Sequence, residues 1–522
     1  MLRDAENSTT RPRSAARALP TLRIDYLWLI IVLAGFAICV ALSLSPPNDF
    51  WWQLKAGQVV AEQGIPTTNM FAWTLPADQP YTYATWLGEW LFYALYRLGG
   101  LSAVVLARNL LAPAALALVA IDARHRSGSW RLAALAALLA GALAINNLIV
   151  RTQVWSWLPF ALYLVILNAY VAGRLPARAL AALPPLMAFW VNAHGAFVLG
   201  LALIGLVAAG ETLRAILPAS QTSPDAGSGW SRLWPLYLAA LATLAATLIN
   251  PSGTGIFGYV AKLLTDPSSQ GLVSEWQPPT TRSAAGAIFF ATTLMLLLAF
   301  AFGRRRPTLT DLLLTCAFLW LAWTGQRYVV WFGMVAMPVL VQSLGARSSV
   351  PARHEPRNAA NLALALAFAV GVVAVQPPLV GRLPLPDAFR QAAADVPGAP
   401  LAFAAATPVA AAEYLRAHPE PSERLFNEMG YGSYLIWALY PDVRVFIDAR
   451  VELYPIEQWQ DYIAIGQARD YNALLIDKYG VTRVMLDRKL QPKLSEALGR
   501  DRLRWTLEYR DAQTEIYRRS ER

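Results

Sequence analysis

The sequence predicts an α-helical integral membrane protein with a small α/β domain at its carboxyl end. Of its 522 residues, 56% are hydrophobic and 15% are charged, whereas an ordinary soluble domain is about 45–50% apolar and about 25% charged. Apolar runs of about 20 residues, the length that a helix needs to cross a bilayer, recur over residues 26–376. These two observations exclude a soluble globular enzyme.

The apolar runs predict about eleven transmembrane helices. The fifth run is short and contains Pro184 and Pro185, which a span tolerates when neighbouring helices satisfy the freed carbonyl groups. The runs are Tyr26–Leu44, Leu101–Ile121, Leu132–Ile149, Trp155–Val171, Ala179–Val191, Phe197–Leu213, Leu233–Ile249, Ala285–Phe302, Leu309–Thr324, Tyr328–Leu344 and Asn358–Val375.

The distribution of Lys and Arg between these runs predicts their orientation, because cytoplasmic loops are rich in both residues. One set of alternating segments carries about 18 basic residues and the other about five. The rich set is Arg3, Arg11, Arg13, Arg17, Arg23, Arg124, Arg126, Arg131, Arg174, Arg178, Arg214, Arg232, Arg304, Arg305, Arg306, Arg347, Arg353 and Arg357. The poor set is Lys55, Arg151, Lys262, Arg282 and Arg327.

We therefore expect residues 1–25 to form a basic cytoplasmic tail in a multi-pass protein of the cell (inner) membrane. An odd number of spans places the chain after about Gln376 on the extracytoplasmic, periplasmic side. Cleavage of the first run as a signal peptide is the alternative, but this run is too long for a signal-peptide core.

Charge and cysteine content exclude other classes of protein. The net charge of +10 comes from arginines clustered between apolar runs, where they set orientation, so no nucleic-acid partner is expected. Cys39 and Cys316 each lie within an apolar run, which excludes a disulfide scaffold. Four histidines leave little scope for a His-rich metal site.

Two outward segments are large. Residues 45–98 contain NDFWWQLKAGQVVAEQG and TWLGEWLFYALYRLGG, whose Trp and Tyr content predicts two helices lying in the membrane interface. Residues 377–522 are long enough for a domain. In this domain RLFNEM, VRVFIDAR and VTRVMLD predict strands, GYGSYLIWAL and YNALLIDKYG predict helices, and LRWTLEYR with TEIYRR predicts a closing hairpin.

Polar and ionisable side chains gather at the outer ends of the predicted spans. Because such groups are costly at membrane depth, their positions indicate function. They are Asp49, Glu89, Arg151, Gln153, Asn192, His194, Asn250, Glu275, Gln326 and Arg327. Since they come from separate segments and face the same side, they predict one outward cavity.

Each residue also has a structural interpretation. Asp49 is a candidate cap for a helix beginning at Phe50. Arg151 and Arg327 could be snorkelling interface anchors. His194 could be a hydrogen-bonded core residue where the chain breaks before Gly195.

The remaining residues have structural interpretations that concern loops and the membrane interface. Glu89 and Glu275, each followed by Trp, could pair with an outward arginine and hold loops together. Trp51 and Trp52 fit aromatic-belt anchors better than sugar platforms.

A carboxylate and two or more arginines around an outward cavity suit transfer of a group from a lipid phosphate. Planar guanidinium groups bind phosphate in a bidentate manner and stabilise charge on the leaving group. Phosphate leaves without much protonation, so one carboxylate is enough to accept the proton of the attacking hydroxyl. Glycoside hydrolysis instead typically uses a pair of carboxylates.

Six segments of the chain form a specific set of motifs: NDFWWQLKAGQVVAEQGIP, TWLGEW, FWVNAHGAFVLG, LINPSG, SEWQPP and LFNEMGYGSYLIWALYPDVRVFIDAR. Together they resemble a family of bacterial multi-pass membrane proteins described as glycosyltransferases of the GT-C superfamily. The resemblance covers about Asp49 to Asp487. It implies a multi-helix bundle, a first outward loop with an essential acidic residue, a polyprenyl-phosphate or polyprenyl-diphosphate sugar donor, and inversion at the anomeric carbon. Asp49 matches the acidic position.

The EMGYGSYL and FIDAR segments also look distantly like the WWDYG-containing region of oligosaccharyltransferase catalytic subunits, but the tryptophans and the aspartate of that motif are missing. A paired Asp-x-Asp motif is absent after the first span as well. No cofactor is therefore certain, and a divalent metal such as Mg²⁺ or Mn²⁺, with Asp49 as a ligand, is left open.

The expected enzyme is a membrane glycosyltransferase in which Asp49 is the general base. Its partners would be the lipid-linked donor, membrane lipids and a glycan, lipid or protein acceptor. Arg151, Arg327 and, more weakly, Lys55 would bind the donor phosphate. The sugar and acceptor site would involve Glu89, Asn192, His194, Glu275, Trp51, Trp52, Tyr431, Tyr434, Asp448 and Arg450, the last four bringing the C-terminal domain over the cavity.

Two alternatives belong to other classes. A transporter or flippase of a lipid-linked or anionic substrate would also need polar groups, but near the middle of the membrane and in related halves. An inactive member could serve as an assembly scaffold, because function depends on the site and not on the fold.

Overall fold

The structure is a computed structural model that describes residues 20–217, 230–345, 357–420 and 422–520. The segment 218–229, whose Ser, Gly and Pro content favours a connector, lies outside the described residues. So do the basic residues Arg3, Arg11, Arg13, Arg17, Arg347 and Arg353.

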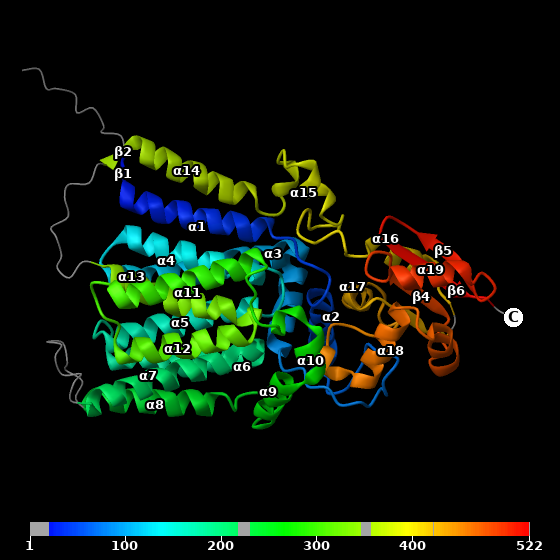
Figure 1. Cartoon of the computed structure of the whole chain (residues 1–522), viewed down its shortest axis with the longest axis horizontal. Helices are drawn as coiled ribbons and strands as arrows, with labels where there is room; N and C mark the ends of the chain where they lie inside the picture. The colour runs from blue at the N-terminus through cyan, green and yellow to red at the C-terminus, as the bar shows by residue number, and fades with distance from the viewer. Residues whose placement is uncertain (1–19, 218–229, 346–356, 421, 521–522) are drawn as a thin grey trace, which may run out of the picture.

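A bundle of helices and a C-terminal domain follow one another along the longest axis of the molecule (Figure 1). Each of the eleven predicted apolar runs coincides with a bundle helix. These helices are α1 (Ile24–Leu42), α3 (Trp86–Ser127), α4 (Trp130–Leu143), α5 (Val154–Val171), α6 (Leu183–Ala193), α7 (Val198–Ile216), α8 (Trp230–Ala246), α11 (Ala284–Phe302), α12 (Leu309–Thr324), α13 (Val329–Leu344) and α14 (Ala359–Ala374).

Among the described residues, six helices are long and apolar enough to cross a membrane. They are α1, α3, α5, α11, and α7 and α13 with their preceding turns; α4, α12 and α14 are shorter apolar helices. The chain is therefore a multi-pass membrane protein, while the count of eleven and the orientation stay predictions. The weakest predicted run forms α6, a helix of only 11 residues in which proline occupies the first turn, a position that tolerates its missing N–H.

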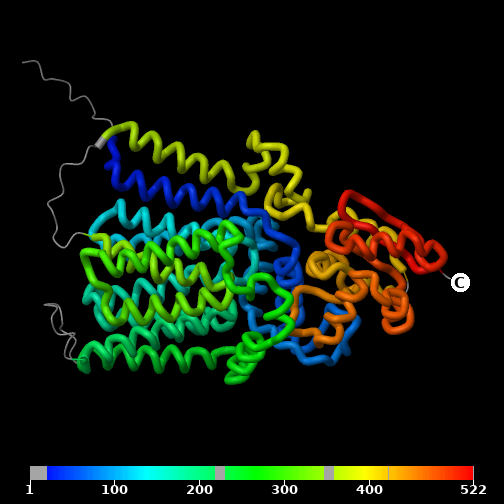
Figure 2. Tube along the Cα trace, viewed as in Figure 1, coloured from blue at the N-terminus to red at the C-terminus, as the bar shows by residue number. Residues whose placement is uncertain are grey.

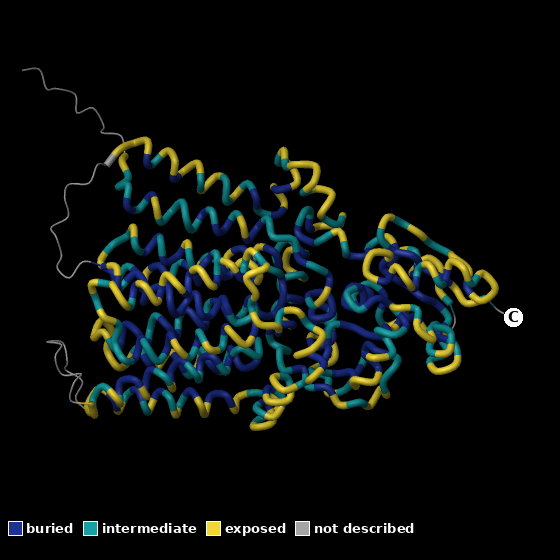
Figure 3. The backbone as a smooth tube through the Cα atoms, viewed as in Figure 1, coloured by how far each residue is buried: buried dark blue, intermediate teal, exposed yellow. Residues whose placement is uncertain are grey.

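Burial identifies the centre of the bundle. Helix α13 is buried along nearly its whole length, whereas α14 packs against α1 at one edge and exposes residues such as Leu366 and Val370. Figure 3 shows the same contrast between the dark interior and the yellow outer turns of α8 and α14. Exposed leucine on these outer helices suits contact with lipid, since a helix apolar on all sides is typical of a membrane span.

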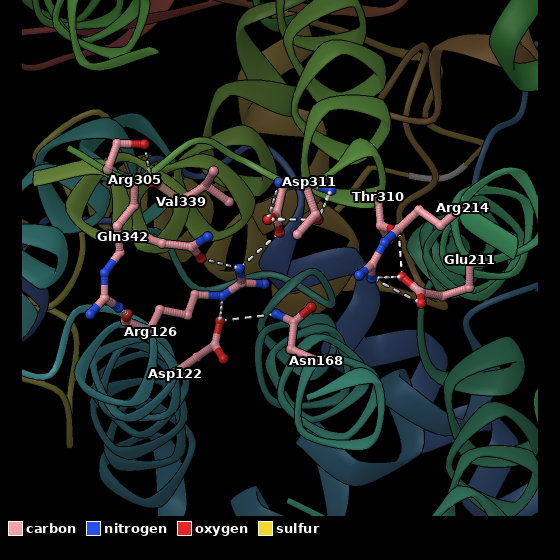
Figure 4. A network of polar contacts seen from close by, with 12 residues as sticks. Asp122, Arg126, Asn168, Glu211, Arg214, Arg305, Thr310, Asp311, Val339 and Gln342 are labelled. Carbon is pink, nitrogen blue, oxygen red and sulfur yellow. Dashed lines mark hydrogen bonds and ion pairs between the residues drawn. The ribbon is translucent and has the colours of Figure 1, made fainter. Parts of the chain in front are cut away.

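A buried ion-pair network, drawn in Figure 4, ties the bundle together where α3 ends and α12 begins. The guanidinium of Arg126 lies 2.7 Å from Asp122 and 2.8 Å from Asp311, and donates a hydrogen bond to Gln342. Asp122 also accepts a hydrogen bond from Asn168. Charges in such surroundings persist when they are paired, so the network joins α3, α5, α12 and α13.

The first outward segment packs against protein on two sides. Helix α2 (Phe50–Gln63) forms as expected, and it contacts both α3 and helix α17 (Met429–Leu439) of the C-terminal domain. Its position in the membrane interface stays a prediction. A Cβ atom at Gly57 would lie 2.0 Å from the carbonyl oxygen of Glu89, so only glycine permits this contact between α2 and α3. The segment TWLGEWLFYALYRLGG is the beginning of α3, separated from the rest of that helix by non-helical residues at Gly99 and Gly100.

The C-terminal domain contains the sheet β3-β4-β6-β5, in which β3 and β4 are parallel and the other pairs antiparallel. The predicted closing hairpin is confirmed, since β5 pairs with β6. The strands are β3 (Leu425–Asn427), β4 (Arg483–Asp487), β5 (Trp505–Arg510) and β6 (Thr514–Arg519). The helices are α15 (Asp387–Gln391), α16 (Val409–Ala417), α17, α18 (Ile456–Gly466), α19 (Pro492–Arg500) and a π-helix at Ala473–Lys478.

One predicted strand of this domain, VRVFIDAR, is not a strand. Its backbone is instead bonded by the first outward segment and by the side chain of Asn427, the last residue of the strand Leu425–Asn427. The N–H of Val445 donates to the carbonyl of Phe71, the N–H of Trp73 donates to the carbonyl of Val445, and the Asn427 side chain bonds the backbone of Phe446 and Ile447. The first outward segment thus takes the place of a neighbouring strand and binds the C-terminal domain to the bundle.

The end of the bundle next to the C-terminal domain carries two further short helices, α9 (Gly255–Thr265) and α10 (Pro267–Leu272). They leave the parallel array beside α2 and the C-terminal domain (Figure 2). At the opposite end, the short strands β1 (Leu22–Arg23) and β2 (Arg357–Asn358) pair in antiparallel orientation and join the beginnings of α1 and α14.

Candidate active site

A cavity of about 240 Å³ lies where the bundle, the first outward segment and the C-terminal domain meet. Of the residues predicted to form one outward cavity, it contains Asp49, Glu89, Arg151, Gln153, His194, Glu275 and Arg327. Trp52 and Arg450 line it as well.

Asp49 lies at the position of an N-cap, directly before α2, but its side chain makes no capping hydrogen bond. The backbone N–H of Trp52, which an N-cap side chain would normally bind, donates to the hydroxyl of Ser433 at 2.9 Å. A serine of the C-terminal domain therefore replaces Asp49 as the cap of α2. This exchange leaves the Asp49 carboxyl in the wall of the cavity.

Asp49, Arg151 and Glu275 form a cluster of charges in that wall. The Arg151 Nη1 atom lies 2.7 Å from Glu275 Oε2 and 3.8 Å from Asp49 Oδ2. Its Nε atom donates to Gln153 Oε1 at 2.8 Å. Arg151 is buried and held by these contacts, so it is a fixed positive charge between two carboxylates and not a snorkelling anchor.

The two carboxyl groups of this cluster have opposite pKa shifts. Burial raises the pKa of Asp49 above its usual value, and the negative charge of Glu275 adds to this while Arg151 opposes it. Burial also acts to raise the pKa of Glu275, but its direct hydrogen bond and ion pair with Arg151 prevail and lower it. The carboxyl farther from the arginine thus has the higher proton affinity, as a general base needs.

Arg327 lies in a turn of 3₁₀-helix (Gln326–Tyr328) before α13, and its guanidinium carbon stacks 4.2 Å from the centre of the Trp276 ring. Among the described residues, no carboxylate forms an ion pair with it. Its guanidinium therefore keeps its hydrogen-bond donors for an anion in the cavity, since each arginine has five N–H groups. Stacking on an aromatic ring holds such a group in place without using these donors.

His194 ends α6 and has a defined tautomer. Its Nδ1 atom accepts the backbone N–H of Ala196 and lies 2.8 Å from the Ser156 hydroxyl, which itself accepts from Trp190. Nδ1 thus accepts both hydrogen bonds, and the proton belongs on Nε2. Burial, together with Arg327 and Arg151, lowers the pKa of His194 to about 3, so the ring is neutral and serves as a hydrogen-bond donor.

Glu89 is fully buried and accepts a hydrogen bond of 2.7 Å from Thr85, not from an arginine. The expectation that it pairs with an outward arginine is wrong, because Arg450, the arginine whose charge acts on it, is bound to Asp448. Its Oε2 atom has no hydrogen-bond partner among the described residues. Glu89 therefore borders the cavity as a carboxyl group with a free acceptor atom.

Arg450 brings the C-terminal domain to the cavity. It binds Asp448 in a bidentate manner, with Nε–Oδ1 and Nη2–Oδ2 distances of 2.9 and 2.7 Å. Its guanidinium carbon lies 5.7 Å from the centre of the Trp52 ring and 5.1 Å from that of Tyr81. Asp448 is completely buried behind it, so the pair is a support for the cavity wall.

Six predicted site residues do not line this cavity, namely Asp448 behind Arg450, Lys55, Trp51, Tyr434, Asn192 and Tyr431. The Lys55 ammonium lies over the rings of Trp437 and Tyr440. Trp51 is fully buried against Phe403 and Tyr434, and is neither an interface anchor nor a sugar platform.

The other two are Asn192 and Tyr431, and both have structural partners. Asn192 accepts from Trp86 and donates to two backbone carbonyls, and it lines a neighbouring cavity together with Asn250. Tyr431 donates to Asp487 inside the C-terminal domain.

Sequence reasoning missed a further polar cluster in the cavity, formed by Glu452, Tyr81 and Tyr259. Glu452 lies two residues after Arg450, and its Oε1 atom accepts hydrogen bonds from the hydroxyls of Tyr81 and Tyr259, each at 3.3 Å. The only available signal was a carboxylate two residues after Arg450 in the DARVELY segment. Its contacts join residues more than 190 positions apart, which no local pattern reveals.

The donor set does not fit a tightly bound divalent metal. Among the described residues, no group of three or more His, Cys, Asp or Glu side chains could hold an ion. Arg151 also occupies the space between Asp49 and Glu275 that a cation would need. Because Mg²⁺ requires a set of oxygen ligands, we derive no step through a metal.

The sequence matches no family model and no curated protein. Among solved structures, it is similar to the mycobacterial arabinofuranosyltransferase AftD, with a TM-score of 0.50 and 15% identity over 96% of this chain and 40% of AftD. A variant of AftD gives a TM-score of 0.51 and 16% identity over 96% of this chain and 42% of that one. The archaeal oligosaccharyltransferase AglB from Archaeoglobus fulgidus, in complex with an inhibitory peptide and a dolichol-phosphate, gives a TM-score of 0.49 and 14% identity over 95% and 75%.

At these identities the similarity concerns the fold alone. AftD is more than twice as long as this chain's match to it, so its activity is not transferred with the fold. The resemblance expected from the sequence is confirmed at the level of architecture: the chain shares its fold with AftD, which is a glycosyltransferase of the GT-C superfamily.

Proposed function

We propose that this protein is an inverting membrane glycosyltransferase that moves a sugar from a polyprenyl-phosphate-linked donor to an acceptor hydroxyl on the extracytoplasmic side. The observation that carries the proposal is the exchange of caps at α2, where Ser433 binds the N–H of Trp52 and leaves Asp49 in the cavity wall. A carboxylate that only capped α2 would make that hydrogen bond itself.

In the proposed reaction, Asp49 accepts the proton of the acceptor hydroxyl. At the same time, the oxygen of that hydroxyl attacks the anomeric carbon of the sugar. The bond between that carbon and the phosphate oxygen breaks, and the lipid phosphate leaves with the electron pair. Attack from the side opposite to the phosphate inverts the configuration. The raised pKa of Asp49 favours this role, because a base with a higher pKa gains more from proton transfer.

Arg327 would bind the phosphate. It stacks on Trp276 with its donors free of protein carboxylates among the described residues, and a charge-assisted bond to the leaving oxygen strengthens as negative charge develops there. His194 would add a neutral N–H donor from Nε2.

Arg151 is a positioning residue in this account. It already binds Gln153 and Glu275 and lies 3.8 Å from Asp49, so it holds the orientation of the base and opposes the rise in the pKa of its carboxyl. Lys55 has no part in donor binding, because its ammonium lies over Trp437 and Tyr440.

The alternatives predict different arrangements. A transporter would need polar groups near the middle of the bundle, whereas the cavity lies at one end of the bundle, against the C-terminal domain. A protein that served only as a scaffold would not need a carboxylate at Asp49 that makes no capping hydrogen bond.

The test is release of polyprenyl phosphate in proteoliposomes that contain the full chain, a panel of polyprenyl-phosphate sugars and mixed acceptors. Release by wild type and not by Asp49→Asn supports the proposal. Absence of release by folded wild type would favour transport or a scaffold role.

A further inference from the structure

A second polar cluster in the same cavity joins three parts of the chain that are distant in sequence. Glu452 comes from a 3₁₀ turn (Val451–Leu453) of the C-terminal domain, Tyr81 from the first outward segment and Tyr259 from α9. Both tyrosine hydroxyls donate to the same carboxylate oxygen, Glu452 Oε1, at 3.3 Å. We call these three residues the Glu452 cluster.

The proposed donor chemistry does not use this cluster. Asp49, Glu275 and Arg327 form the charged wall described above, and none of them bonds Glu452 among the described contacts. Among the described residues, the hydrogen bonds from other side chains to Glu452 both go to Oε1, and the residue lines the cavity. Each tyrosine oxygen can also accept a hydrogen bond. The cluster therefore presents several acceptor atoms to whatever occupies this side of the cavity.

The charges of Glu452 and Arg450 restrict which kind of molecule can bind beside the cluster. An anion would be repelled by Glu452, and a cation would meet Arg450, whose guanidinium carbon lies 5.1 Å from the centre of the Tyr81 ring. A neutral molecule rich in hydroxyl groups satisfies both conditions, since each hydroxyl can donate to a carboxylate or a phenolic oxygen. The ring of Trp52, which also lines the cavity, offers an apolar face.

We propose that the Glu452 cluster is the acceptor subsite and that the acceptor is a neutral, polyhydroxylated glycan. This rests on the proposed function, because the acceptor hydroxyl must lie in the same cavity as Asp49. Glu452 binds and orients the acceptor and takes no part in proton transfer.

The experiment measures direct binding of sugars to the full chain in nanodiscs, without donor. The probes are neutral pentose and hexose oligosaccharides, each with a counterpart in which one sugar is a uronic acid. The variants are Glu452→Gln, which removes the charge but keeps the shape, and Tyr259→Phe, which removes one hydroxyl. Glu457→Gln on the exposed surface of α18 is the matched control.

Wild type is expected to bind at least one neutral oligosaccharide about tenfold more tightly than its uronic-acid counterpart. Glu452→Gln should weaken the neutral ligand by about tenfold or more, the loss expected for a hydrogen bond to a charged group, and should reduce the discrimination against the acid. Tyr259→Phe should cause a smaller loss, and Glu457→Gln none.

Three results would overturn the proposal. They are binding of no neutral oligosaccharide by folded wild type, preference for the uronic acids, and unchanged binding by both cluster variants. Because no donor is present, these results are separate from a failure of the proposed transfer, which would appear as a lack of polyprenyl-phosphate release. If Glu452→Gln fails to fold, Tyr259→Phe alone decides between a subsite and an unrelated structural contact.

Discussion

Replacement of Arg327 by alanine tests whether the free guanidinium of the cavity binds the donor phosphate. The side chain stacks at 4.2 Å on Trp276 and has no carboxylate partner among the described residues, so removal leaves no unpaired protein charge behind. A hydrogen bond to a charged group contributes about 1.5–3 kcal/mol, which corresponds to a loss of affinity of about 10- to 150-fold. Arg327→Lys should lie between wild type and alanine, because it keeps the charge but loses the planar fork.

The assay is equilibrium binding of a short-chain polyprenyl phosphate to the full protein in nanodiscs. Arg282→Ala is the matched control, since Arg282 is an exposed arginine of the same outer region and does not line the cavity. Equal affinities for wild type and Arg327→Ala would refute the phosphate assignment. A loss of the same size in Arg282→Ala would show that only general surface charge attracts the lipid.

The remaining predictions concern proton affinity, capping and packing. Activity should rise as pH increases through the raised pKa of Asp49. Glu275→Gln removes a negative charge that raises this pKa, so it should shift the acidic limb of the pH–rate profile to lower pH. An unchanged acidic limb would contradict the coupling between Glu275 and Asp49. Ser433→Ala should destabilise the protein by about 0.5–2 kcal/mol and reduce transfer, since Asp49 becomes the available cap; full activity would count against the exchange of caps. Gly432→Ala places a Cβ atom 2.3 Å from the carbonyl oxygen of Ile447 and should cost about 1–3 kcal/mol, measured as a lower thermal unfolding temperature in detergent. Arg126→Ala removes the nearest cation of two buried aspartates and leaves Asp122 only its longer contact of 3.5 Å with Arg174. It should cost about 3–5 kcal/mol in the same measurement, whereas a cost near zero would mean that the network is hydrated.

The sequence predicted the bundle well because membrane spans are read from local composition. Every predicted apolar run coincides with a helix, and the run with Pro184 and Pro185 forms the shortest of them, as its prolines suggest. Convergence of the polar outer ends was also predictable, since alternation of spans brings every second loop to the same side. This is how Asp49 and Arg327 could be placed in one cavity.

Contacts between distant segments could not be predicted from local patterns. The segment VRVFIDAR has the composition of a strand, but the residues that bond its backbone belong to the first outward segment and to Asn427. Trp51 is of a residue type that is typical of membrane-interface anchors, yet the C-terminal domain covers it.

Glu452 shows the same limit at the site itself. The two tyrosines that bind it come from the first outward segment and from α9, and nothing in the neighbouring sequence marks them as its partners. Likewise Lys55 has the charge for phosphate binding, but aromatic rings of the C-terminal domain cover its ammonium.

The most direct test of the central claim compares the rate of transfer by wild type and Asp49→Asn with donor at saturation, after donor binding has been measured for both. Asparagine keeps the shape of the side chain and cannot accept the proton, so the rate should fall by about 10²- to 10⁴-fold while donor affinity changes little. Asp387→Asn, at an exposed position of the C-terminal domain, is the control. A rate within a few-fold of wild type, with the protein folded and donor bound, would show that Asp49 is not the base.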